Sequence, residues 1–238
     1  LSMPKTGLRV AQRPNLEADG GIPVAQHIRG IQPYVAVSSL EAMRSEPERE
    51  SFKIDWNEAT VPPSPAVSKA ITEFLSNSHH LNLYPVLNSQ NLIGCLADYH
   101  GLSQDQFLVT NGSDDALNTL CSTYLDVDDR VLVVSPTYQH FLVFVQSRGA
   151  TVEHFYGLDP FQPDIDGLIE KAAQVRPRMI YLANPNNPTG VMYSVDAIKL
   201  LLEANPTALV IVDEAYSEFA GQSARQLLYT YSNLVITR

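Results

Sequence analysis

The sequence predicts an α/β fold in which a mainly parallel, doubly wound sheet is covered by helices on both faces. From residue 107 onward, short apolar runs alternate with amphipathic segments of helical period. Strands and helices that alternate in this way indicate βαβ units, whose crossovers bury both faces of a parallel sheet. Of the 238 residues, 45% are hydrophobic and 18% are charged, which is ample material for such a core.

The beginning of the chain has less pattern. Residues 1 to about 30 mix proline, glycine and charge without periodicity and predict an arm or disordered leader. A short helix is expected over 39–44, and residues 52–56 alternate like a strand. We therefore place a boundary near residue 50, between an N-terminal arm and the rest of the chain.

The remaining elements follow in a regular series. Ser64-Pro65 predicts an N-cap and a first-turn proline that open a helix through Leu75. A second helix, from about Ser89 through Tyr99, is expected to end at a C-cap, Gly101. Further strands are expected over 107–110, 131–134, 151–155, 179–182, 209–212 and 234–237, and further helices over 114–124, 138–146, 165–174 and 195–204.

Charge and composition exclude several classes of partner. A formal net charge of -10 argues against nucleic acids and anionic membranes, which attract basic surfaces. No apolar run approaches membrane-spanning length, and no signal pattern begins the chain, so we expect a cytoplasmic protein. Cys95 and Cys121 lie far apart, and the histidines lack ligand spacing, so neither a disulfide framework nor a metal site is expected.

Two of the expected strands end in turns that could bind a ligand. Asn111-Gly112-Ser113-Asp114-Asp115 joins a strand to a helix, where backbone N–H groups and the helix dipole favour an anion. The same turn could be a simple capped helix, and it matches neither GxxxxGK[ST] nor GxGxxG. Tyr138, after the next strand, could lie flat against a planar heterocycle or simply pack on the sheet.

Two later turns carry more specific patterns. Residues 184–190, Asn-Pro-Asn-Asn-Pro-Thr-Gly, contain two Asn-Pro steps that favour a rigid path and hold the Asn187 amide at the sheet edge. Asp213 ends an apolar strand, as the magnesium-binding aspartate of an ATPase would, but the chain has no Walker A lysine loop. Alternatively, the Asp213 carboxylate faces a pyridine nitrogen and keeps it protonated, with Tyr216 near the ring oxygen.

Taken together, these motifs resemble the fold-type I enzymes that depend on pyridoxal 5′-phosphate (PLP), in the class I/II aminotransferases. The resemblance covers about Ile31 to Arg238 and is greatest to the histidinol-phosphate aminotransferase group. It implies that residues 1–50 form an N-terminal arm with part of a small domain, and that 51–238 form a PLP-binding large domain that is incomplete at its C-terminal end. The pair formed by residues 184–190 and 213–216 (Asp-Glu-Ala-Tyr) is the most specific part. Softer matches are Gln32-Pro33-Tyr34, Ile54-Asp55-Trp56-Asn57-Glu58, Tyr84-Pro85 and Gly112-Ser113-Asp114-Asp115.

The resemblance implies a role for each matching residue. Asp213 would pair with the pyridine nitrogen, Asn187 and Tyr216 would hold the ring oxygen, and Tyr138 would stack on the ring. Tyr84 would reach the phosphate in a neighbouring subunit, which implies a homodimer. The backbone N–H groups that would bind the PLP phosphate belong to Ser113, Asp114 and Asp115, and the residues near the substrate would be Tyr34 and Asn57.

The resemblance also implies a lysine that forms a Schiff base with PLP. No lysine follows Lys199, and Ile236-Thr237-Arg238 resembles the strand just before that lysine, so we expect an inactive fragment of an aminotransferase of amino-acid biosynthesis. Its substrates would be an amine, such as an amino acid or histidinol phosphate, and a 2-oxo acid. The family usually has Asn-Glu-Asn where this chain has Asn57-Glu58-Ala59. A decarboxylase or lyase on the same fold, and a non-catalytic module for PLP binding or dimerisation, are the alternatives.

Overall fold

The computed structural model describes residues 25–31, 57–59, 61–76 and 81–238. They fall into two compact units, one of which holds Gly112–Arg238 together with the start of the chain to Pro33, and the other Tyr34–Asn111. The helix expected over 39–44, the strand expected over 52–56 and the domain boundary expected at residue 50 lie outside the described residues.

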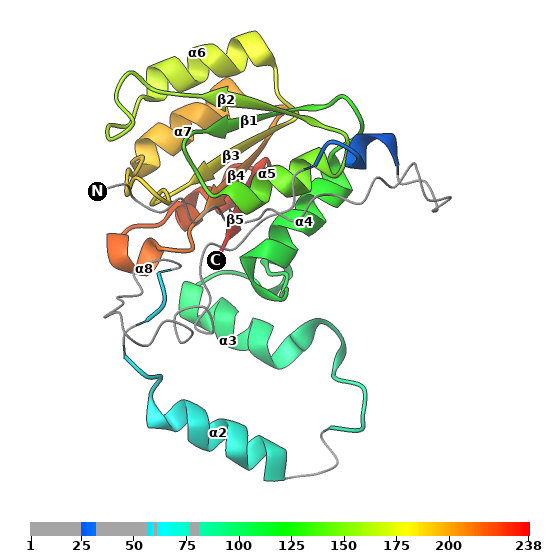
Figure 1. The fold of residues 1–238 in the computed structure, drawn as a ribbon. Helices are drawn as coiled ribbons and strands as arrows, with labels where there is room; N and C mark the ends of the chain where they lie inside the picture. Colours follow the sequence, from blue (N-terminus) through cyan, green and yellow to red (C-terminus); the bar gives the residue numbers. More distant parts are fainter. Residues whose placement is uncertain (1–24, 32–56, 60, 77–80) are drawn as a thin grey trace, which may run out of the picture. The chain divides into compact units, whose positions relative to one another are not determined.

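The first unit is built on a sheet of five parallel strands, which confirms the predicted fold class (Figure 1). The order across the sheet is β2-β1-β3-β4-β5, so the two strands buried along their whole length, β3 and β4, lie inside it. The strands are β1 Arg130–Val134, β2 Thr151–Phe155, β3 Met179–Ala183, β4 Leu209–Asp213 and β5 Leu234–Thr237.

Helices cover both faces of this sheet, as the sequence predicted (Figure 1). One core lies under α4 and α5 and includes Leu117, Phe141 and Ile211. The other lies under α6 and α7 and includes Leu168 and Val210. The helices of the unit are η1 Gln26–Ile28, α4 Gly112–Tyr124, α5 Gln139–Gln146, α6 Ile165–Val175, α7 Val195–Ala204, α8 Ser217–Ala220 and η5 Ala224–Tyr229.

Side-chain caps fix where the two helices of the second face begin. The Asp164 carboxylate accepts a hydrogen bond from the Gly167 N–H (2.9 Å) at the start of α6. The Ser194 hydroxyl accepts one from the Ala197 N–H (3.1 Å) at the start of α7. Such caps satisfy N–H groups that have no partner inside the helix, so the chain turns from loop to helix at defined residues.

The second unit contains helices, among them α2 Pro65–Ser76 and α3 Gln90–His100. Pro65 is the first residue of α2, and Gly101 ends α3 in the left-handed region at φ 67°, as predicted. The short helices η3 Leu87–Ser89 and η4 Gln104–Gln106 flank α3. The strand predicted over 107–110 is wrong, because this apolar run pairs with no strand of the described residues. No helix in the described part of the chain is long and apolar enough to cross a membrane.

The order of the strands marks the place where a ligand would bind. β1 pairs with β2 on one side and with β3 on the other, so the connections after β1 and β3 leave in opposite directions. In open parallel sheets, the crevice at such a switch point, outside the carboxyl ends of the strands, receives ligands. The turns that follow β1 and β3, residues 135–138 and 184–190, lie at this crevice.

Candidate active site

The most buried charge at the carboxyl edge of the sheet belongs to two neighbours, Asp213 and Glu214, at the end of β4. Asp213 is 6% exposed. One of its oxygens, Oδ2, accepts a hydrogen bond from the Tyr181 hydroxyl at 2.7 Å, and the other accepts one from the Ala215 N–H at 3.2 Å. Both donors are neutral, so the Asp213 carboxylate is buried without a cation among these partners.

Burial changes the acidity of Asp213 and of its hydrogen-bond donor Tyr181. Burial raises the pKa of Asp213 above its ordinary value, and the hydrogen bonds from Tyr181 and the Ala215 N–H act in the opposite direction. Burial, followed by the charge of Asp213, raises the pKa of the Tyr181 phenol. Tyr181 is therefore a permanent donor at neutral pH, while the charge on Asp213 is costly until a cation approaches it.

The turn after β3 is held by the amides of two asparagines. The side-chain amide of Asn184 accepts a hydrogen bond from the Tyr193 backbone N–H (2.7 Å) and donates one to the Tyr193 backbone carbonyl (3.1 Å). The backbone N–H of Asn184 donates to the backbone carbonyl of Asp213 (2.8 Å). Asn186 donates to the Thr189 hydroxyl at 2.8 Å. Asn187, between these bonds, is half-buried. The turn is thus rigid and tied to the strand that carries Asp213.

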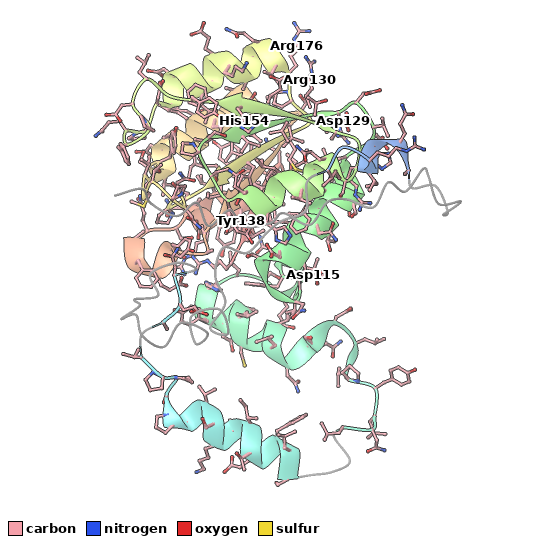
Figure 2. The ribbon with its side chains drawn as sticks, viewed as in Figure 1. Asp115, Asp129, Arg130, Tyr138, His154 and Arg176 are labelled. Carbon is pink, nitrogen blue, oxygen red and sulfur yellow. The ribbon has the colours of Figure 1, made fainter. Side chains whose placement is uncertain are left out.

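The turn after β1 is joined to the same asparagine. The Asn186 side chain donates to the Pro136 carbonyl (2.8 Å) and accepts from the Thr137 hydroxyl (3.0 Å). These two bonds cross the switch point and fix one turn against the other. Tyr138 follows directly, half-buried between β1 and α5 (Figure 2).

The start of α4 lies beside Tyr138. The Tyr138 hydroxyl donates to the two oxygens of Asp114 (3.0 and 3.2 Å), and His140 Nδ1 lies 3.0 Å from Asp114 Oδ2. The Asp114 charge also acts on Asp213, whose pKa it raises in part. The start of α4, Tyr138 and Asp213 therefore form one electrostatic cluster.

Behind Asp213, Glu214 anchors the end of the sheet. This carboxylate is 1% exposed and accepts hydrogen bonds from the Ser223 hydroxyl and the Ala224 N–H, both at 2.7 Å. Arg238 Nη2, after β5, lies 2.7 Å from Glu214, and Nη1 lies 3.2 Å from Glu218. Glu214 therefore has a structural role, holding the segments after β4 and β5 together.

The structure brings most of the predicted site residues into one unit. Tyr216 is half-buried just before α8. Tyr84, 99% exposed, and Asn57, in a turn with φ 52°, belong to the other unit, and Tyr34 lies outside the described residues. The predicted residues that share the first unit are Ser113, Asp114, Asp115, Tyr138, Asn187, Asp213 and Tyr216.

Sequence analysis overlooked two residues of this cluster, Tyr181 and His140. A signal for Tyr181 existed, because a tyrosine in an otherwise aliphatic buried strand must find a partner for its hydroxyl. Ala183 pairs with Asp213, and residues two apart in a strand share a face, so Tyr181 faces the same side. Lys199 lies on α7 and pairs with Glu203 (3.9 Å).

Comparisons with known proteins agree with this architecture. The family model "Aminotransferase class I and II" matches residues 50–238. A dihydroxyacetone phosphate transaminase of Campylobacter jejuni is 36% identical over 214 residues, which cover 90% of this chain and 58% of that protein. A histidinol-phosphate aminotransferase of Methanothermobacter thermautotrophicus is 31% identical over 228 residues, which cover 94% of this chain and 60% of that protein. The chain thus spans about three fifths of the length of these relatives.

Two solved structures give the same result. The histidinol-phosphate aminotransferase of Sinorhizobium meliloti in complex with pyridoxal-5′-phosphate shares the fold, with a TM-score of 0.77, 23% identity and coverage of 90% of this chain and 57% of that chain. A putative histidinol-phosphate aminotransferase of Erwinia carotovora has a TM-score of 0.69 and 27% identity, with coverage of 77% and 54%. Because that family model matches residues 50–238, which are most of this chain, the chain belongs to the class I and II aminotransferase family.

Proposed function

We propose that this protein is a PLP-dependent aminotransferase, which exchanges an amino group and a carbonyl oxygen between two small substrates. The observation that carries the proposal is the Asp213 carboxylate, buried at the ligand-binding edge of a parallel sheet, where its oxygens accept hydrogen bonds from the neutral Tyr181 hydroxyl and Ala215 N–H. Membership of the aminotransferase family and the likeness to a PLP complex support the same cofactor.

The residues present fit the pyridine ring of PLP. Burying the Asp213 charge costs free energy, and a protonated ring nitrogen would offset that cost through a charge-assisted hydrogen bond. Thr237, which pairs with Asp213 across the sheet, has a buried hydroxyl that opposes the effect of burial on the pKa of that carboxyl.

The neighbouring turns fit the remaining parts of the cofactor. α4 begins at Gly112, at φ 77°, and its first N–H groups, from Ser113, Asp114 and Asp115, would bind the phosphate. The Asp114 carboxylate accepts from the Tyr138 hydroxyl and lies 3.0 Å from His140 Nδ1, and the group that would bind an anion is the Asp114 backbone N–H. Tyr138 would stack on the ring.

The ring oxygen would be held by the amide of Asn187 and the phenol of Tyr216. When bound, PLP supplies an electron-withdrawing ring that stabilises negative charge at the carbon bearing the amino group. Asp213 serves this chemistry by holding a proton at the ring nitrogen, while the bonds from Asn186 to the turn after β1 keep Asn187 in place.

We propose substrates that carry a phosphate ester. The two relatives act, by their names, on dihydroxyacetone phosphate and on histidinol phosphate, which share a phosphate and differ in the rest of the molecule. A 2-oxo acid such as 2-oxoglutarate, or its amino acid, would be the second substrate. Tyr84, fully exposed in its own unit, would contact the phosphate of PLP in a second subunit of a cytoplasmic homodimer.

The test is an assay of the full-length gene product, supplied with PLP. One reaction contains histidinol phosphate and 2-oxoglutarate and is followed by glutamate formation. The other contains dihydroxyacetone phosphate and glutamate and is followed by glutamate loss. We expect turnover in one of them and a dimer by analytical ultracentrifugation. Release of carbon dioxide from a phosphorylated amino acid would instead indicate a decarboxylase, and PLP binding without turnover of any amine would indicate a non-catalytic module.

A further inference from the structure

Asp213 has a partner that the proposed function does not use. Tyr181, in the middle of β3, donates its hydroxyl hydrogen to Asp213 Oδ2 at 2.7 Å, and both side chains are buried. The other oxygen, Oδ1, accepts the Ala215 N–H. The two oxygens therefore have different donors, and the stronger, shorter hydrogen bond comes from a side chain.

The Tyr181 hydroxyl cannot turn away from Asp213. The Tyr181 ring is fully buried and stacks on Phe141, with ring centroids 4.0 Å apart and an angle of 18° between the planes. The backbone is fixed as well, because Ala183, two residues along β3, pairs with Asp213 on β4. A buried, stacked phenol with two torsion angles keeps one orientation, so the hydrogen bond is preorganised.

A hydrogen bond from a neutral donor changes where a proton rests between a carboxylate and a ring nitrogen. By stabilising the anion, the donor lowers the proton affinity of the carboxylate. The Tyr181 hydroxyl opposes in this way the effect of burial, which raises the pKa of Asp213. Among the described residues, the titratable groups whose charges act on this pair are Asp114 and Tyr138, and the charge of Asp114 also raises the pKa of Asp213. Without Tyr181, only the Ala215 N–H and the Thr237 hydroxyl would oppose burial and the charge of Asp114, both of which favour a protonated Asp213.

We propose that Tyr181 is a positioning residue that keeps Asp213 anionic and aimed, so that the shared proton stays on the ring nitrogen of bound PLP. This inference rests on the proposed function. The Tyr181 hydroxyl, on the strand next to Asp213, would thus help to determine whether the ring nitrogen is protonated, at a site where burial disfavours the anionic form of Asp213.

The test compares Tyr181→Phe with Tyr193→Phe in the full-length gene product loaded with PLP that carries ¹⁵N at the pyridine position. Tyr181→Phe keeps the ring on Phe141 and removes only the hydroxyl. Tyr193 is an equally buried tyrosine whose hydroxyl accepts from the Asp164 N–H (3.4 Å), so its variant removes a hydroxyl elsewhere in the unit. The readout is the ¹⁵N chemical shift at pH 7, which reports the share of protonated ring nitrogen independently of turnover.

We expect the ratio of protonated to unprotonated ring nitrogen to fall about tenfold in Tyr181→Phe, the effect of one hydrogen bond on the proton position, and to stay unchanged in Tyr193→Phe. Incorporation of 3-fluorotyrosine at position 181, a nearly isosteric and more acidic phenol, should raise the ratio and covers the case in which the phenylalanine variant does not fold. A wild-type ratio in both position-181 proteins would overturn the inference.

Asp213→Asn separates this inference from the proposed function. If the labelled nitrogen responds to Asp213→Asn but not to the two changes at Tyr181, only the inference about Tyr181 fails. If the bound ring nitrogen is unprotonated in the wild type and Asp213→Asn leaves it unchanged, the contact between Asp213 and the ring fails, and with it the proposed site.

Discussion

Two tyrosine–carboxylate pairs lie at the same edge of the sheet, and they differ mainly in burial. Tyr181 donates to Asp213 at 2.7 Å in the interior, whereas Tyr138 donates to Asp114 at 3.0 and 3.2 Å, where the Asp114 side chain is 43% exposed. Water competes for the exposed pair and is excluded from the buried one, so the same chemical contact has a larger effect at β4. Burial, rather than residue type, therefore makes Asp213 the electrostatic centre of the candidate site.

The largest expected effect comes from the aromatic ring that supports the buried pair. Phe141→Ala removes a fully buried ring that stacks on Tyr181, and we expect a loss of about 3–5 kcal/mol in the free energy of unfolding. Phe144→Ala, on the same helix beside His140, removes a partly buried ring and should cost about 1–2 kcal/mol. Urea unfolding of both variants measures the difference. Equal losses would contradict the contrast in packing between the two regions.

The next effect concerns activity. Asp213→Asn keeps the shape of the side chain but removes its charge, and we expect kcat/KM to fall about 10-fold to 150-fold, the effect of one hydrogen bond to a charged group. Asp114→Asn should change kcat/KM only a few-fold, because that carboxylate is partly solvated. Steady-state kinetics with whichever substrate pair the full-length protein turns over in the assay above measure both variants. A larger loss from Asp114→Asn would reverse the assignment.

A third comparison uses the two glutamates that bind Arg238. Glu214→Gln leaves the Ser223 hydroxyl and the Ala224 N–H with a neutral partner, and we expect a loss of about 1–3 kcal/mol in unfolding free energy. Glu218→Gln, at a side chain that is 60% exposed, should change it by less than about 0.5 kcal/mol. Thermal unfolding followed by circular dichroism distinguishes them, and similar shifts in Tm would mean that Glu214 is not the anchor.

The smallest effect is a pH dependence in the protein without PLP. Because burial raises the pKa of Asp213, the folded state holds this proton to higher pH than the unfolded state does, so the contribution of Asp213 to stability falls as pH rises from 3.8 to the raised pKa and is then constant. Asp213→Asn removes this loss. We therefore expect the variant to gain stability relative to the wild type across this window, as measured by urea unfolding from pH 4 to pH 7. A relative loss of stability with rising pH would show that the folded state favours the charged carboxylate.

The sequence predicted the elements whose pattern is local and missed the features that depend on partners. All five strands of the sheet were located; β1, β3, β4 and β5 are mainly apolar runs between turn residues, while β2 mixes apolar and polar residues. The run over 107–110 has the same local pattern but no neighbouring strand in the described residues, and a strand exists only through pairing. The motif that contains Asp213 is local and could be recognised in the sequence. The hydrogen bond from Tyr181, 32 residues away, depends on how β3 and β4 are aligned, which a local pattern does not specify.

The contact between Asp213 and the cofactor would be visible in a crystal structure of the full-length gene product with PLP. We expect an Asp213 carboxylate oxygen about 2.7–2.9 Å from the pyridine nitrogen, the length of a charge-assisted hydrogen bond, with the Tyr181 hydroxyl still bonded to the same carboxylate. A ring bound with its nitrogen against any group other than Asp213 would contradict it.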